Sequence, residues 1–135
     1  MRAVLDPNIL IAALLSPSGA PAQLDTRWLG GEFELVVTEG LLPELERALA
    51  YPKLRRRVPA KDATAFVNLL RAGAILAPDC PAGVNRSADP GDDYLLALAE
   101  HERAVLVSGD NHLLELADDL PIFTAKVFAD RLPAG

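Results

Sequence analysis

Short apolar segments alternate with longer amphipathic segments along the chain, and this alternation restricts the fold more than any other feature. The apolar segments predict strands at Ala3–Leu5, Phe33–Val37, Ala74–Leu76 and Ala104–Val107, with an edge strand at Pro121–Phe123. Helices are predicted at Asn8–Leu15, Pro21–Leu29, Ala60–Ala72, Asp92–Glu102, Leu113–Ala117 and Lys126–Leu132, and a further helix is capped by Thr38 and runs to about Ala50. This α/β order predicts a mainly parallel sheet between two helical layers.

The composition fits one soluble domain covering residues 1–135, with 50% hydrophobic residues and 24% charged residues. No apolar run approaches the ~18 residues of a membrane span. The apolar stretch Ile9–Leu15 follows Asp6, Pro7 and Asn8, which interrupt it and argue against a signal peptide. Because Cys80 is the only cysteine, no intramolecular disulfide can form, and we expect a cytoplasmic protein.

Several acidic residues fall where the expected strands end or the next helices begin. Asp6 follows the first strand, Asp110 follows the fourth, and Asp92 and Asp93 open the helix before the fourth strand. Parallel strands bring Asp6 and Asp110 to the same edge of the sheet, where ligands bind in such folds. Taken singly, each aspartate is explained as a helix cap or a complement to a helix dipole.

Glu44 lies inside the helix after the second strand and borders its apolar stripe. Glu46 borders the other edge of that stripe, so the periodicity does not choose between the two. Carboxylates gathered at one edge repel each other unless a cation intervenes. Oxygen ligands favour Mg²⁺ or Mn²⁺, and such ions can activate water for attack on a phosphodiester.

Four segments of the chain, in this order and spacing, resemble the PIN-domain family, in the branch related to the VapC toxins of toxin–antitoxin pairs. The resemblance covers roughly Met1 to Leu116. The segments are VLDPNIL at 4–10, LLPELERAL at 41–49 with YPKL at 51–54, DPGDDYLLALA at 89–99, and VSGDNHLL at 107–114.

The resemblance implies a Rossmann-like PIN fold and an Mg²⁺- or Mn²⁺-dependent endoribonuclease that cuts RNA with metal-activated water. It matches the catalytic, metal-binding acids to Asp6, Glu44, Asp92 and Asp110, and so favours Glu44 over Glu46. Asp93 is an additional metal ligand candidate. It also implies a homodimer and a cognate antitoxin protein as partner.

The chain departs from the family pattern at three places. Pro7 stands in place of a small hydroxyl residue, Ser108 in place of threonine, and His112 where many relatives carry aspartate. These changes leave Asp6, Glu44, Asp92 and Asp110 in place. His112 puts in doubt the role of a fifth acid, because many relatives carry that acid at its position. Asn8 and Ser108 remain candidates to orient the acids by hydrogen bonds, with a plain helix-start role for Asn8 as the alternative.

The net charge of −6 and the pI near 4.8 argue against a generally basic nucleic-acid-binding surface. The dense basic stretch is Lys53, Arg55, Arg56 and Arg57. It is interpreted either as a contact for RNA or a partner, or as a solvated loop.

Two other functions fit parts of the pattern. A degenerate PIN module would bind RNA or a protein without cutting. A phosphoreceiver domain also places aspartates at strand ends, but it needs an aspartate after a middle strand and a lysine after a late one. Asp79 lies in a proline-flanked loop and Lys126 lies far from a convincing strand, which disfavours the phosphoreceiver.

Overall fold

The computed structural model describes residues 1–78, 93–115 and 121–132, and excludes the side chains of Asp93, Tyr94, Asn111 and His112. Within these residues one parallel sheet has the strand order β3-β2-β1-β4-β5. The strands are β1 (Arg2–Leu5), β2 (Glu34–Thr38), β3 (Ile75–Ala77), β4 (Val105–Val107) and β5 (Ile122–Phe123). The helices are α1 (Pro7–Leu15), α2 (Ala20–Leu29), α3 (Leu41–Ala50), α4 (Pro52–Arg55), α5 (Ala60–Gly73), α6 (Asp93–His101), α7 (Asn111–Leu114) and α8 (Ala125–Arg131).

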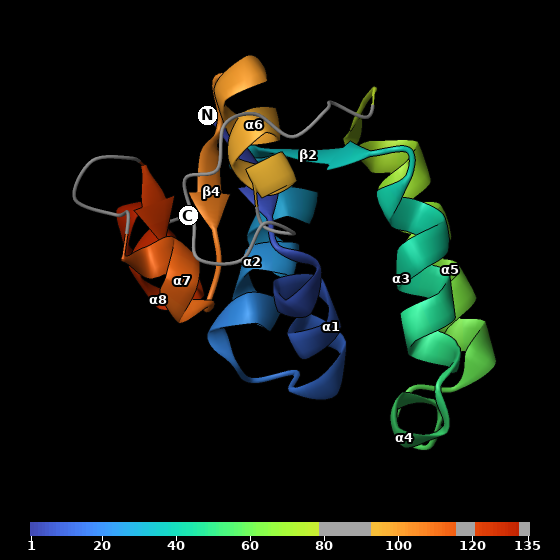
Figure 1. Cartoon of the computed structure of the whole chain (residues 1–135). Coiled ribbons are helices and arrows are strands. Elements are labelled where there is room, and N and C mark those ends of the chain that lie inside the picture. The colour runs from blue at the N-terminus through green and yellow to red at the C-terminus, as the bar shows by residue number, and fades with distance from the viewer. Residues whose placement is uncertain (79–92, 116–120, 133–135) are drawn as a thin grey trace.

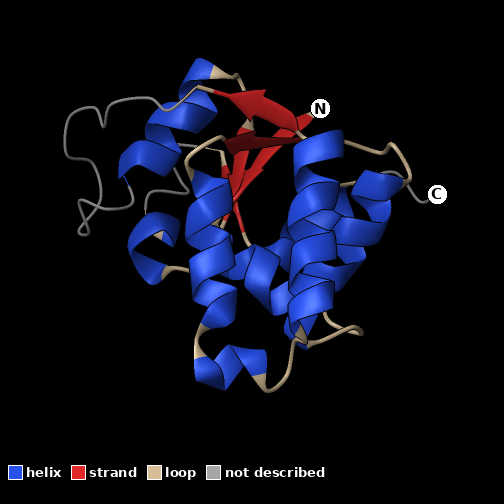
Figure 2. Cartoon of the chain, turned by 90° about the vertical axis from the view of Figure 1, so that its right-hand side faces the viewer, coloured by secondary structure: helices blue, strands red, loops and turns tan. Residues whose placement is uncertain are grey.

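The two faces of the sheet are covered by different helices (Figure 1, Figure 2). Successive side chains of a strand point to opposite faces, so Ala3 and Leu5 of β1 enter one hydrophobic core while Val4 enters another. The first core is filled from α1, α2, α3, α5 and α8. The second is filled from α6 and α7. The expected three-layer α/β/α sandwich is therefore confirmed, and every strand pairing is parallel.

Two local expectations need correction. No helix was expected over the basic stretch, but Pro52–Arg55 forms α4. Proline suits the first helical position because its φ is preset there, and the amide of Arg55 donates to the Tyr51 carbonyl at 2.8 Å. The helix expected from Leu113 begins earlier, at Asn111, because the Asp110 carbonyl accepts from the amides of Leu113 and Leu114.

Helices α3, α4 and α5 form an arm at one side of the molecule, with α3 and α5 side by side and α4 at the far end (Figure 1). We refer to this unit as the α3–α5 arm. Its far end touches the body through Arg57, whose Nη2 donates to the Leu15 carbonyl at 3.1 Å. That carbonyl belongs to the last residue of α1, so the far end of the arm and the end of α1 are joined directly.

No helix within the described ranges has the length and apolar character needed to cross a membrane.

Candidate active site

Asp6 sits at the junction of β1 and α1 and is only 5% exposed. Its amide donates to the Val107 carbonyl at 2.9 Å, which extends the pairing of β1 with β4 by one residue. Its side chain caps α1, where Oδ1 accepts from the Asn8 amide at 3.0 Å and Pro7 occupies the first turn. The predicted helix cap is therefore present, and capping uses only one of the two carboxylate oxygens.

Ser108 engages the second oxygen of Asp6. Its Oγ donates to Asp6 Oδ2 at 2.8 Å and accepts from the Asp110 amide at 3.0 Å. Ser108 is fully buried, and the register Leu5↔Val107 places it beside Asp6. One hydroxyl therefore joins the two predicted acidic positions at the carboxyl ends of β1 and β4. Hydrogen bonds to ionised groups are among the stronger ones in proteins.

Asp6 and Asp110 lie on the wall of one pocket. The pocket has a volume of about 450 Å³ and is lined by Asp6, Asn8, Ile9, Gly109 and Asp110. Asp110 is half-buried there, immediately before α7. Ile9 and Gly109 were not singled out from the sequence, and their only signal was their position next to Asn8 and Asp110. The parallel sheet thus brings together two acids that are far apart in the sequence.

Asp6 Oδ1 accepts from the backbone amide of Asn8, which is the ordinary contact of a helix N-cap. Any residue other than proline could supply that donor. The Asn8 side chain is exposed and lines the pocket. The contact of Asn8 with Asp6 therefore does not depend on the Asn8 side chain, whereas the contact of Ser108 with Asp6 depends on the Ser108 hydroxyl.

Glu44 lies in the first turn of α3, and both Glu44 and Glu46 are exposed. Helix α3 follows β2, which pairs in parallel with β1, so α3 begins near the edge of the sheet that carries Asp6. Glu44 is not among the residues that line the pocket. Glu46 Oε1 instead lies 3.7 Å from Arg71 Nη2 of α5.

The remaining predicted residues divide into two groups. Asp92 lies outside the described residues, and the side chains of Asp93 and His112 do so as well. Lys53, Arg55, Arg56 and Arg57 are exposed at the far end of the α3–α5 arm, away from the pocket lining. Among the side chains that the structure describes, no three His, Cys, Asp or Glu residues are grouped closely enough to hold a metal ion.

A PIN domain model matches residues 2–112, which is most of the chain. The chain belongs to the PIN-domain family. It is 26% identical to the uncharacterized protein MJ1680 of Methanocaldococcus jannaschii in an alignment 124 residues long, which covers 88% of this chain and 77% of that protein. The crystal structure of PAE2754 from Pyrobaculum aerophilum superimposes with a TM-score of 0.67 at 19% identity, covering 97% of this chain and 88% of that one.

Membership of the PIN-domain family gives this chain a nuclease-type fold, in a family whose nucleases generally use divalent metals. The donors at the pocket of this PIN domain fit such an ion in chemistry, because the Asp6 and Asp110 carboxylates are hard oxygen ligands. Two carboxylates are fewer donors than a divalent ion takes up, so further ligands would have to come from water, substrate or other side chains.

Replacing the buried hydroxyl in Ser108→Ala is expected to lower the free energy of unfolding by about 1–3 kcal/mol. The change removes the hydroxyl that donates to Asp6 Oδ2 and accepts from the Asp110 amide, and losing the hydrogen bond to a buried carboxylate costs this much. Urea denaturation measures the effect. Ser18→Ala, at an exposed position, should stay within about 0.5 kcal/mol of the native protein. Equal stabilities for the two variants would contradict the bridging role.

Asp25 of α2 is a half-buried carboxyl outside the pocket lining, and burial raises its pKa from 3.8 to about 6. The folded state therefore holds the Asp25 proton more tightly than the unfolded state between about pH 4 and 6. Stability from this group is present below the unfolded pKa and is lost as the pH rises through this window.

Asp25→Asn is accordingly expected to raise the free energy of unfolding at pH 7.5 by about 1–2 kcal/mol, allowing for solvent screening of a partly exposed side chain. At pH 4 the gain should nearly vanish, because the native carboxyl is then protonated in the folded state. Denaturation at the two pH values measures this difference. Asp130→Asn, at an exposed position of α8, is the control, and a gain for Asp25→Asn that is equal at both pH values would refute the expectation.

Proposed function

We propose that this PIN domain is an Mg²⁺- or Mn²⁺-dependent endoribonuclease. The main support is the arrangement of Asp6, Ser108 and Asp110 at the carboxyl ends of two adjacent parallel strands, on the wall of a pocket. A capping role explains one oxygen of Asp6 but gives no reason for burying its second oxygen against Ser108. A preorganised carboxylate at this edge is what oxygen-liganded metal chemistry requires.

In this proposal Asp6 and Asp110 hold the ion, with Asp92 and Asp93 as further ligands and Glu44 completing the site from α3. Such an ion would supply an activated water and would stabilise the leaving oxygen of the phosphodiester. The chain itself contributes rigidity. Ser108 and the Asn8 amide hold both Asp6 oxygens at 2.8 and 3.0 Å, so little side-chain entropy is lost when a ligand binds.

The finer biological assignment rests on the sequence resemblance to VapC-related proteins. We propose that the protein is a cytoplasmic toxin, acts as a homodimer, and is held inactive by a cognate antitoxin protein. The alternative is a PIN module that binds RNA or a protein without cleavage. His112, at a position where many relatives carry aspartate, is the feature that favours the alternative.

Cleavage of a pool of single-stranded RNAs by the purified protein tests the proposal. EDTA should abolish cleavage and Mg²⁺ or Mn²⁺ should restore it. Glu44→Gln should slow the metal-dependent reaction, whereas Glu46→Gln is the matched control, with the same chemical change two residues away on an exposed position of α3. Metal-independent RNA binding without any cleavage would overturn the proposal in favour of the non-catalytic module.

A further inference from the structure

The far end of the α3–α5 arm combines positive charge with an exposed aromatic ring. Tyr51, between α3 and α4, is 67% exposed. Lys53, Arg55 and Arg56 follow it within five positions and are exposed as well. We call these four residues the basic tip. In the described part of the chain, no carboxylate lies within salt-bridge distance of any of its three cations.

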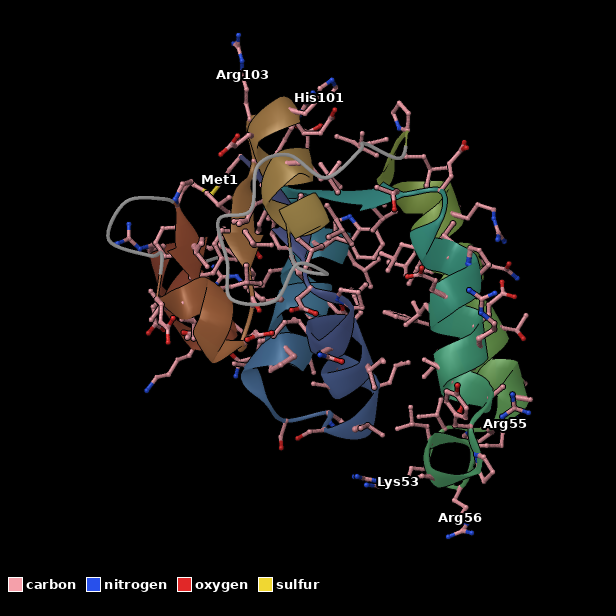
Figure 3. The ribbon with its side chains drawn as sticks, viewed as in Figure 1. Met1, Lys53, Arg55, Arg56, His101 and Arg103 are labelled. Carbon is pink, nitrogen blue, oxygen red and sulfur yellow. The ribbon has the colours of Figure 1, made fainter. Side chains whose placement is uncertain are left out.

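The three cations spread around the end of the arm (Figure 3). Lys53 points toward the side of the arm where α1 lies, Arg55 lies on the other side, and Arg56 points away from the body. Arg103, by contrast, lies at the opposite end of the molecule. The basic tip is thus a local concentration of positive charge on a chain whose net charge is −6.

Arg57, next to the basic tip, differs from it in its bonding. Its Nη2 donates to the Leu15 carbonyl, which fastens the tip to the last residue of α1. The residue directly before α1 is Asp6, its N-cap. Helix α1 therefore runs from the acidic pocket to the residue that Arg57, beside the basic tip, contacts.

The length of this helix gives the distance from the pocket to Leu15, the residue that Arg57 contacts. Nine residues of α1 span about 13 Å at 1.5 Å per residue. A nucleic-acid strand carries one phosphate per roughly 3.4 Å when its bases are stacked, so about four phosphates of a stacked strand cover that distance. A strand whose scissile phosphate lies at the pocket therefore reaches the Leu15 end of α1, which Arg57 beside the basic tip contacts, after about four nucleotides.

We propose that the basic tip is a second contact for single-stranded RNA, in which Lys53, Arg55 and Arg56 bind phosphates and Tyr51 stacks on a base. This inference rests on the proposed function and adds where the substrate is held outside the pocket. A surface that carried only cations could bind an acidic protein as readily as RNA. The exposed Tyr51 ring favours nucleic acid, because single-strand binding sites combine a basic track with aromatic stacking.

The binding experiment uses the full chain in EDTA, so that it is independent of cleavage. The probe is a fluorescently labelled single-stranded RNA of mixed sequence and about 12 nucleotides, within the range of known single-strand sites. The test variant is Lys53→Gln/Arg55→Gln/Arg56→Gln. The matched control is Arg71→Gln/Arg103→Gln/Lys126→Gln, which removes the same number of exposed charges from other surfaces.

Affinity is measured by anisotropy between about 50 and 200 mM salt, where phosphate contacts dominate the salt dependence. The test variant should reduce the slope of log K against log salt by about 2, since each single-strand phosphate contact contributes ~0.7. The control should leave the slope close to that of the native protein. Equal losses in both variants, or no loss in the test variant, would overturn the proposal.

Tyr51 is tested separately. Tyr51→Ala should weaken binding by about fivefold or more without changing the salt slope, whereas Tyr51→Phe should keep the affinity, because stacking needs the ring and not the hydroxyl. If the triple variant does not fold, Arg56→Gln alone should still reduce the slope by ~0.7. Loss of affinity in Tyr51→Phe equal to that in Tyr51→Ala would contradict stacking.

The two proposals fail in different ways. Tip-dependent RNA binding in EDTA, without any cleavage in Mg²⁺ or Mn²⁺, would leave the second contact standing and remove the nuclease assignment. Metal-dependent cleavage, together with RNA binding that does not depend on the basic tip, would leave the nuclease assignment standing and remove the second contact.

Discussion

Asp6→Asn and Asp110→Asn are each expected to lower metal-dependent RNA cleavage by about 100-fold or more. Both residues lie on the wall of the same pocket and are joined through Ser108. Each substitution removes a negative oxygen from the proposed ion site while keeping the shape of the side chain. Loss of a residue that only orients a metal ligand typically costs 10–100-fold, so loss of a ligand itself should cost more.

The fold should survive these substitutions. Asparagine caps a helix about as well as aspartate, so in Asp6→Asn the amide oxygen of the new side chain would still accept from the backbone amide of Asn8. Single-turnover cleavage measures the activity, and circular dichroism with urea denaturation measures the fold. Asp130→Asn, at an exposed position of α8, is the matched control and should retain full activity. Full metal-dependent activity in Asp110→Asn would remove Asp110 from the active site.

Phe128→Ala is expected to lower the free energy of unfolding by about 3–5 kcal/mol, the usual cost of emptying a buried aromatic position. Phe128 of α8 is 1% exposed, and its ring lies edge-on to Phe33 with centroids 5.2 Å apart. Since small domains are stable by only about 5–15 kcal/mol, this loss should be visible as a large fall in the urea midpoint. Val127→Ala, at the exposed neighbouring position, should change stability by less than about 1 kcal/mol.

The effect of Phe128→Ala also tests whether the core of the domain needs α8. The PIN domain match ends at residue 112, so α8 lies beyond it. Yet α8 contributes Phe128 and Ala129 to the same core as β1 and α1. In addition, Arg27 Nη1 of α2 donates to the Ala129 carbonyl at 3.2 Å. A small effect of Phe128→Ala would mean that the core is complete without α8.

Most of the fold was predictable from the sequence because it follows from local patterns. Segments such as Leu35–Val37 and Leu106–Val107 are apolar on both faces, which a strand needs when helices cover both sides of a sheet. Their alternation with helical segments led to the parallel sheet and to the expectation that Asp6 and Asp110 share one edge. Position alone also predicted that Asp6 caps α1, as it does.

The contacts that shape the candidate site depended on the tertiary structure. The sequence named Ser108 as an orienting residue, but only the register of β1 with β4 shows that its hydroxyl joins Asp6 to the Asp110 amide. Likewise, only the structure shows that Asn8 acts through its backbone. Nothing in the local pattern separates a side-chain donor from a main-chain donor.

By itself, the sequence determined the order of the strands, the parallel sheet and the edge of the sheet at which Asp6 and Asp110 meet, because these depend on periodicity and on positions along the chain. The tertiary structure decided that α4 lies at the end of an arm, and that Arg57 beside it donates to the Leu15 carbonyl of α1. The physical reason is that this contact joins residues 42 positions apart. Such a contact depends on how the elements pack, and no local pattern in either segment encodes it.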